Sequence, residues 1–251
     1  MPHRTRPIHF FCIFLVFTFI LTACSNVSSQ SSNTHPVQQK RTTQSTPIFM
    51  PGGPVTYVAL GASDAVGIGS NVPGSQGYVP LVAAHLPKKS HLINLGISGI
   101  QLHEALSQEV PLALTTSPNL ITIWLVANDF IGDVTYDNYL HDLNSLLQQL
   151  HVSTHARIVM ANLPDLTRLP AFANETPSQK SQMIVAIQKW NMGIAKLAKK
   201  YGVALVDLFG QGSQITAHPE YISGDGFHPS PAGYVQLANY FWQVIEGGEK
   251  R

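Results

Sequence analysis

The 251-residue sequence is poor in charged residues. Lys, Arg, Asp and Glu together make up only 12% of it, and the formal net charge is +1. Proteins that bind nucleic acids through phosphate groups usually present a strongly basic surface. The composition therefore gives no sign of a nucleic-acid partner. The chain also lacks an internal repeat.

Cysteine is almost absent as well, with only Cys12 and Cys24 in the whole sequence. Cys12 lies in an apolar run, residues 8–20, that follows a basic segment and is short for a membrane span. This arrangement predicts a secretory signal peptide over residues 1–23. After its removal a single cysteine remains, so an intramolecular disulfide is excluded and the exported domain must depend on its core.

The predicted signal peptide is followed by a cysteine in the segment LTAC, residues 21–24. This segment resembles a bacterial lipobox, which implies cleavage before Cys24 and lipidation of its thiol. The protein would then be exported and anchored to the outer face of the cell membrane. The alternative is an ordinary signal peptide that ends beside a cysteine. Residues 24–54 are rich in Ser, Thr, Gln and Pro, which predicts a flexible tether, and the folded domain is expected over residues 55–251.

Short apolar runs alternate with longer helical stretches from residue 55 onward. Five nearly continuous apolar runs are typical of parallel strands covered on both faces: residues 56–62, 90–98, 119–127, 156–163 and 203–209. A last helix is expected to have Ser230 as its N-cap and Pro231 as its first residue. The pattern predicts an α/β fold with an open, doubly wound, five-stranded parallel sheet. In such folds the functional site lies at the carboxyl ends of the strands.

Polar clusters stand at those expected strand ends. The segment GASD (residues 61–64) follows the first strand, GISG (96–99) the second and ANDF (127–130) the third, while DGFH (225–228) precedes the last helix. Four clusters that converge on one edge of a sheet are more informative than any one alone. We therefore expect the functional site there.

Ser63 is the candidate nucleophile in the first cluster. A serine hydroxyl is weakly nucleophilic and needs a base, which in turn needs an orienting group. Asp225 and His228 stand three positions apart, a spacing that lets the carboxylate reach one ring nitrogen and leaves the other for Ser63. The N–H groups of Ser63 and Gly96 and the side-chain amide of Asn128 are candidate donors to an oxyanion. Each of these residues taken alone can be explained as an ordinary turn or loop residue. Taken together, they favour a hydrolase.

In order and spacing, the four clusters resemble the sequence blocks of the SGNH, or GDSL-type, serine hydrolases over roughly residues 55–246. The resemblance implies a flavodoxin-like three-layer α/β/α sandwich and no metal or organic cofactor. It also implies Ser63 as nucleophile, His228 as general base and acid, and Asp225 as the residue that orients His228. Gly96 and Asn128 would complete an oxyanion hole with the N–H of Ser63.

Two positions depart from the family pattern. Ala62 stands where the first block usually has Asp, and Val126 stands where the third block usually has Gly. Neither change removes a proposed catalytic group. Asp64 follows the nucleophile and is expected to disfavour anionic substrates. The absence of G-x-S-x-G around Ser63 argues against the α/β-hydrolase fold.

The resulting hypothesis is a carboxylic ester hydrolase that works through an acyl-enzyme. Its expected partners are an ester substrate and, through lipidated Cys24, a membrane; no obligate protein partner is evident. The alternatives are a polysaccharide O-deacetylase, a thioesterase or an acyltransferase on the same site, or a non-catalytic binding lipoprotein. We further expect Asp129 to fix a loop and residues 163–177 to form one wall of the site. No histidines show a spacing typical of metal ligands.

Overall fold

The computed structural model describes residues 52–247. The predicted signal peptide, Cys24 and residues 25–51 of the predicted tether lie outside the described residues. Within the described part, Val55 is buried and the first strand begins at Thr56. None of the helices in residues 52–247 is both long enough and apolar enough to cross a membrane.

A five-stranded sheet forms the centre of the fold, and all its strands run parallel in the order β2-β1-β3-β4-β5. Each of the five predicted apolar runs contains one strand, so the predicted parallel sheet is confirmed. The strands are β1 (Thr56–Gly61), β2 (His91–Asn94), β3 (Leu120–Trp124), β4 (Arg157–Ala161) and β5 (Ala204–Val206). Every residue of the central β3 is buried, as expected for a strand covered on both faces.

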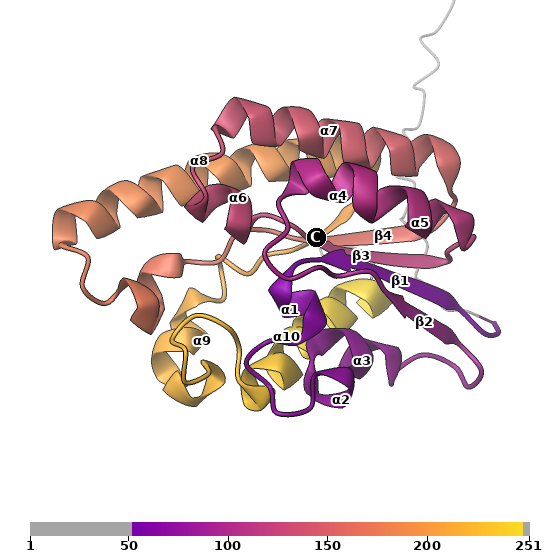
Figure 1. Cartoon of the computed structure of the whole chain (residues 1–251), viewed down its shortest axis with the longest axis horizontal. Helices are drawn as coiled ribbons and strands as arrows, with labels where there is room; N and C mark the ends of the chain where they lie inside the picture. Colours follow the sequence, from indigo (N-terminus) through magenta and orange to yellow (C-terminus); the bar gives the residue numbers. More distant parts are fainter. Residues whose placement is uncertain (1–51, 248–251) are drawn as a thin grey trace, which may run out of the picture. The chain divides into compact units, whose positions relative to one another are not determined.

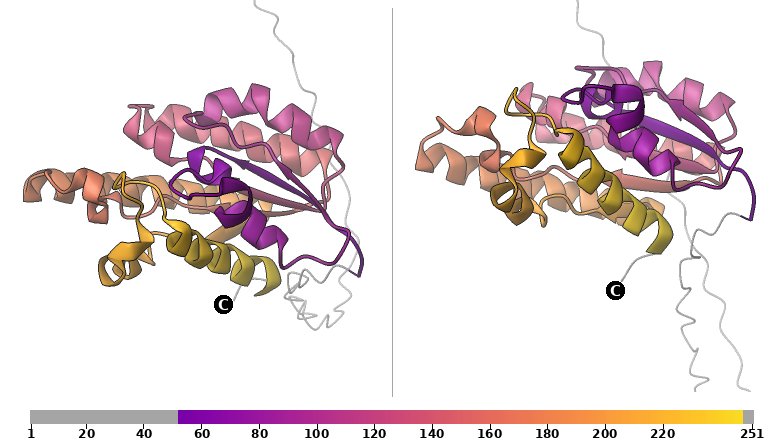
Figure 2. Two further views of the ribbon diagram at one scale, coloured as in Figure 1. Left: turned by 60° about the horizontal axis from the view of Figure 1, so that its bottom comes forward. Right: turned by 90° about the horizontal axis from the view of Figure 1, so that it is seen from below.

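Helices cover both faces of this sheet and complete the three layers that the family resemblance implied (Figures 1 and 2). One layer contains α4 (Leu102–Gln108), α5 (Val110–Thr115), α7 (Tyr136–Ser153) and α8 (Pro177–Tyr201). The other contains α3 (Tyr78–Ala83) and α10 (Pro231–Gly247), which pack against each other. Amphipathic helices therefore shield the central strands β1 and β3 from solvent on both sides, while the edge strand β2 stays mostly exposed.

In two of these helices the local sequence explains which face is buried and where the helix begins. Helix α7 buries one face at helical spacing: Tyr139, Leu143, Leu146, Leu147 and Leu150. Helix α10 begins at Pro231, and the N–H of Gly233 donates to Ser230 Oγ at 3.2 Å. Ser230 is thus the N-cap, as predicted.

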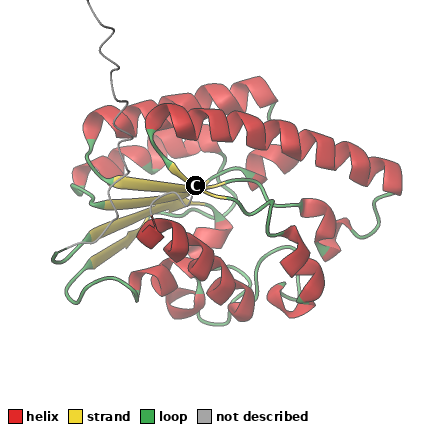
Figure 3. Ribbon diagram, turned by 180° about the vertical axis from the view of Figure 1, so that it is seen from behind, coloured by secondary structure: helices red, strands yellow, loops and turns green. Residues whose placement is uncertain are grey.

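Short helices and loops follow the carboxyl ends of the strands (Figure 3). The short α-helices are α1 (Ser63–Val66), α2 (Pro73–Gln76), α6 (Ala127–Ile131) and α9 (Gly212–Ala217). The 3₁₀ turns are η1 (Leu166–Arg168), η2 (Pro170–Phe172) and η3 (Pro219–Tyr221). Since α1 begins two residues after β1 ends, and α6 three residues after β3 ends, the predicted polar clusters lie at this edge.

Candidate active site

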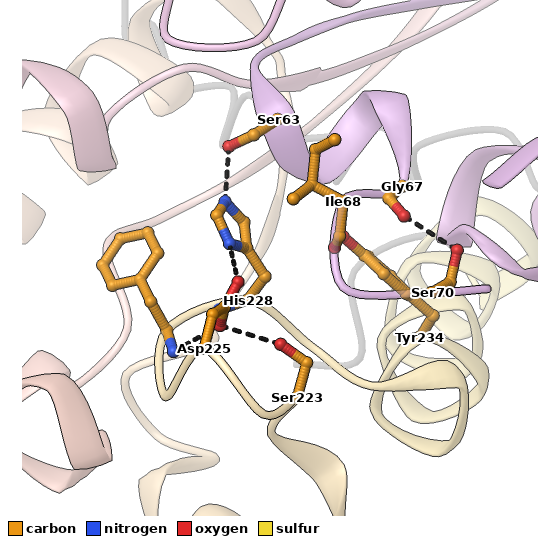
Figure 4. Close-up of polar contacts among 9 residues, drawn as sticks. Ser63, Gly67, Ile68, Ser70, Ser223, Asp225, His228 and Tyr234 are labelled. Carbon is orange, nitrogen blue, oxygen red and sulfur yellow. Dashed lines mark hydrogen bonds and ion pairs between the residues drawn. The ribbon is translucent and has the colours of Figure 1, made fainter.

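Ser63, His228 and Asp225 form a continuous hydrogen-bonded chain (Figure 4). The Oγ of Ser63 lies 2.9 Å from Nε2 of His228, and Nδ1 of His228 lies 2.7 Å from Oδ2 of Asp225. Ser63 is almost completely buried, with 6% of its surface exposed. The structure therefore brings the three predicted residues together in the order that nucleophilic catalysis requires: hydroxyl, base and orienting carboxylate.

The loop before α10 holds Asp225 in place through its second carboxylate oxygen. Oδ1 accepts hydrogen bonds from Ser223 Oγ at 2.8 Å and from the N–H groups of Phe227 and His228 at 2.8 and 3.0 Å. Gly226 permits this turn because its φ of +77° is in the left-handed region. Partial burial acts to raise the pKa of Asp225, but these hydrogen bonds and that from the His228 ring prevail and hold it well below its usual range. The carboxylate is thus ionised when it faces His228.

The turn that carries Ser63 packs closely against the loop after β2. A Cβ added at Gly61 would lie 2.7 Å from Cβ of Ala65, and a Cβ added at Gly96 would meet the same atom at 2.7 Å. Such contacts are too short for carbon atoms, so only glycine fits at either position. This explains, in physical terms, why glycine stands both before the serine and in the second polar cluster.

Two of the three predicted oxyanion donors already have acceptors. The N–H of Gly96 donates to Oδ1 of Asn94 at 3.1 Å, and Nδ2 of Asn128 donates to the carbonyl of Ile100 at 2.9 Å. An Asn amide carries two N–H groups, so Asn128 keeps a second donor. The N–H of Gly96 would have to be shared with Asn94 or exchanged for it when substrate binds. The oxyanion hole therefore stays a prediction.

Two buried carboxyl groups support the segments around the site. Both oxygens of Asp129 accept from the N–H of Leu102, at 3.2 and 3.0 Å, so Asp129 fixes a loop as predicted; its burial raises its pKa to about 6. Glu109 accepts from the N–H of Gly61 at 3.0 Å. Sequence reasoning missed Glu109, because a glutamate at the end of an amphipathic helix is normally exposed to solvent.

A largely apolar cavity of about 110 Å³ is lined by sequence neighbours of the triad residues, although no triad residue lines it. Its lining includes neighbours of the proposed catalytic residues: Asp64 next to Ser63, Ala127 next to Asn128, and Phe227 and Pro229 on either side of His228. As expected, the segment 163–177 forms part of the wall, through Pro164, Leu166 and Leu169. The cavity therefore offers space for an apolar group next to Asp64 and the loop that carries His228.

Asp64 places a carboxyl group on the wall of this cavity. Burial raises its pKa to about 6, although the positive charge of protonated His228 acts in the opposite direction. Above about pH 6 the group is negatively charged. No cluster of three or more His, Cys, Asp or Glu side chains within residues 52–247 could hold a metal ion.

Comparison with known proteins identifies the family. A family model, described as the GDSL-like lipase/acylhydrolase family, matches residues 59–236. The chain belongs to this family. Proteins of this family are lipases and acylhydrolases, so the GDSL protein is an ester hydrolase. The matched region contains the triad, Gly96 and Asn128. No curated protein sequence matches the chain.

Solved structures with the same fold include several ester hydrolases. A psychrotrophic esterase from Pseudoalteromonas sp. is 19% identical, with 76% of this chain and 96% of that chain covered and a TM-score of 0.58. An acetyl xylan esterase from Geobacillus stearothermophilus is 20% identical, with coverages of 78% and 96% and a TM-score of 0.60. Phospholipase A1 from Streptomyces albidoflavus is 21% identical, with coverages of 75% and 100% and a TM-score of 0.61. At these identities the likeness concerns the fold, and the GDSL protein shares it.

Proposed function

We propose that this GDSL-family hydrolase cleaves esters of short, apolar carboxylic acids through a Ser63 acyl-enzyme. The observation that carries the proposal is the chain from Ser63 Oγ through His228 to Asp225, with distances of 2.9 and 2.7 Å. A binding protein gains nothing from a buried serine that is hydrogen-bonded to an oriented histidine. The same arrangement is what an acyl-transfer catalyst needs.

In the proposed first step, Ser63 Oγ attacks the ester carbonyl carbon and His228 Nε2 takes the serine proton. The carbonyl oxygen becomes negatively charged and is stabilised by the N–H of Ser63, the amide of Asn128 and the N–H of Gly96 once Asn94 shares it. Asp225 holds Nδ1 protonated, so that Nε2 is free to accept. His228 then protonates the leaving alcohol, and Ser63 remains acylated.

The second step uses the same groups in reverse. A water molecule attacks the acyl carbon while His228 Nε2 removes its proton, and the oxyanion again forms in the site. Collapse of the intermediate returns the proton to Ser63 Oγ and releases the carboxylic acid. Residues of this chain therefore supply the nucleophile, the proton transfers and the oxyanion stabilisation in both steps.

The cavity supports a short, uncharged acyl group. An apolar cavity of about 150 Å³ holds a benzene ring of roughly six carbons, so 110 Å³ corresponds to about four carbons. The carboxyl of Asp64 on its wall is ionised above about pH 6 and would repel an anionic acyl group. We therefore propose butyrate-sized esters, rather than long-chain or dicarboxylic ones, as good substrates.

The decisive experiment follows hydrolysis of p-nitrophenyl esters from acetate to palmitate by the purified protein and by Ser63→Ala. We expect an optimum near butyrate and a loss of at least about 10³-fold in the variant. A fluorophosphonate probe should label Ser63 in the wild type. Absence of both turnover and labelling, in folded protein, would contradict a hydrolase that uses Ser63. A preference for acetylated polysaccharide over every p-nitrophenyl ester would instead favour the O-deacetylase.

We also propose that the protein is a lipoprotein on the outer face of the cell membrane. Support comes from the sequence alone: the basic segment, the apolar run and LTAC before the Ser-rich tether. Cys24→Ser should abolish incorporation of labelled palmitate, with esterase activity unchanged. Wild-type protein found in the soluble fraction without palmitate would contradict the proposal.

A further inference from the structure

Glu109 stands at the junction between α4 and α5, in the helical layer above the sheet in Figure 1. Its side chain is fully buried. Burial of a carboxyl group is costly unless the group is neutral or has strong partners. None of the ion pairs within residues 52–247 includes Glu109. The burial of Glu109 without a countercharge is energetically costly, so it needs a role that explains it.

The hydrogen bond of Glu109 leads to the strand that carries the nucleophile. Its Oε2 accepts from the N–H of Gly61 at 3.0 Å, and Gly61 is the last residue of β1, two positions before Ser63. The other oxygen, Oε1, has no partner within the described residues. Burial raises the pKa of Glu109 to about 8, so the carboxyl is neutral at pH 7 and still accepts through Oε2.

Gly61 transmits this contact to the loop that contains Gly96. The carbonyl of Gly61 accepts from the N–H of Ile97 at 3.0 Å, and Ile97 directly follows Gly96. One peptide unit on each side of Gly61 is therefore held, by Glu109 on one side and by Ile97 on the other. The three segments that meet here are the α4–α5 junction, the end of β1 and the loop after β2.

The position of Gly61 matters because the segments around Ser63 and Gly96 are tightly packed. Ala65 packs against Gly61 and Gly96 so closely that a Cβ on either would clash with it. Without Glu109, the N–H of Gly61 would be buried and unpaired, which a small shift of the strand end could relieve. Such a shift would alter the spacing between the N–H groups of Ser63 and Gly96, and misplacement by about 1 Å can cost about 100-fold in rate.

We propose that Glu109 is a positioning residue for the oxyanion hole, which holds the N–H groups of Ser63 and Gly96 at their working distance through Gly61. The inference rests on the catalytic roles proposed above. It assigns no contact between Glu109 and substrate. Its effect falls on stabilisation of the transition state, so it changes kcat and leaves KM nearly constant.

The test compares three variants of the full-length protein. Glu109→Gln keeps an acceptor for Gly61, whereas Glu109→Met has a similar length and no acceptor. Glu104→Gln is the matched control, because Glu104 is exposed on the same helix and bonds only to the helix start, through the N–H of Gln101. We expect kcat to fall by about 10- to 100-fold in Glu109→Met, with KM within twofold of wild type. Glu109→Gln should stay within about threefold, and Glu104→Gln should equal wild type.

A folded Glu109→Met variant with wild-type kcat, or one in which only KM rises, would overturn the proposal. If this variant does not fold, Glu109→Asp takes its place, because its shorter side chain withdraws the acceptor from Gly61. The same loss of kcat is expected, and an unchanged kcat would again overturn the proposal. Ser63→Ala in the same series separates the two hypotheses, since an active Ser63→Ala would refute the proposed mechanism itself.

Hydrogen exchange gives a readout that does not depend on activity. The amides of Gly61 and Ile97 should exchange at least about tenfold faster in Glu109→Met, or in Glu109→Asp, than in Glu109→Gln. Amides of the remote strand β5 should not change between the variants. Equal exchange at Gly61 and Ile97 in all variants would show that Glu109 does not hold this segment, whatever reaction the site performs.

Discussion

Nε2 of His228 lies 2.9 Å from Oγ of Ser63, although 165 positions separate the two residues in the chain. Ser63 begins α1 directly after β1, and His228 stands in the loop before α10. The hydroxyl of Tyr234 in α10 also contacts the carbonyl of Ile68, which follows α1. The catalytic hydrogen bond therefore exists only when the C-terminal helix is docked on the sheet, and it reports on the tertiary structure as a whole.

Replacing the orienting carboxylate should disable the site without disturbing the fold. In Asp225→Asn, the side-chain amide would present an N–H to Nδ1 of His228 and favour the tautomer whose Nε2 carries the proton. We expect kcat to fall by about 10³- to 10⁴-fold. Ser223→Ala is the matched control, because it removes one hydrogen bond to Oδ1 of Asp225 and leaves the ring contact; its loss should be below about tenfold. An Asp225→Asn variant with a tenth or more of wild-type activity would exclude Asp225 from the role.

The sheet could be predicted because its central strands β1 and β3 are buried on both faces, whereas the edge strand β2 is mostly exposed. Every predicted run contains one strand, but the strands are shorter than the runs, and β5 spans only Ala204–Val206 within residues 203–209. Apolar residues at the ends of a run also line loops and the core, so periodicity does not fix strand boundaries. The order of the strands, β2-β1-β3-β4-β5, comes from the structure, since composition carries no information on which strands are neighbours.

The triad could be predicted because its chemistry requires a serine, a histidine and a carboxylate, and because the order of the polar clusters resembles that of the family's sequence blocks. The hydrogen bonds that support the triad could not be predicted from the sequence. The N–H of Gly96 is bonded to Asn94, and Glu109 reaches Gly61 across 48 positions. Both contacts depend on side-chain directions that only the packed fold determines. A buried glutamate at a helix junction has the same sequence signature as an exposed one.

The close contact between α1 and the loop after β2 gives a second prediction, on Gly96. A Cβ at this position would lie 2.7 Å from Cβ of Ala65, so Gly96→Ala should push this loop away from α1, lower the melting temperature and reduce kcat by about 10- to 100-fold. Ala65→Gly removes the clashing atom at the cost of a glycine in α1. The double variant should therefore recover part of the activity lost in Gly96→Ala. If the losses of the two single variants simply add in the double variant, this contact is not their cause.

Titration of Glu109 should make stability depend on pH. Its pKa is about 8 in the folded protein and about 4.5 in the unfolded chain. Between these values the folded state binds the proton and the unfolded state does not, so the free energy of unfolding falls as pH rises from about 4.5 to 8. Glu109→Gln removes this contribution. The melting temperature of the variant relative to wild type should therefore rise from pH 5 to pH 8.5. A constant difference for Glu109→Gln would mean that its carboxyl titrates normally.

The apolar cavity predicts how acyl-chain preference can be changed. Ile215 of α9 lines it, and Ile215→Phe would fill part of its 110 Å³. A single methylene in an apolar pocket is worth roughly 10- to 200-fold in selectivity. We expect kcat/KM for p-nitrophenyl butyrate to fall at least about tenfold, while the value for the acetate, which does not need the filled space, stays within about twofold. Ala217→Phe is the matched control: it adds the same aromatic group on an exposed position of the same helix and should leave both values unchanged. If Ile215→Phe lowers kcat/KM for both esters equally, the substitution does not act through the acyl chain, and the cavity is not the acyl pocket.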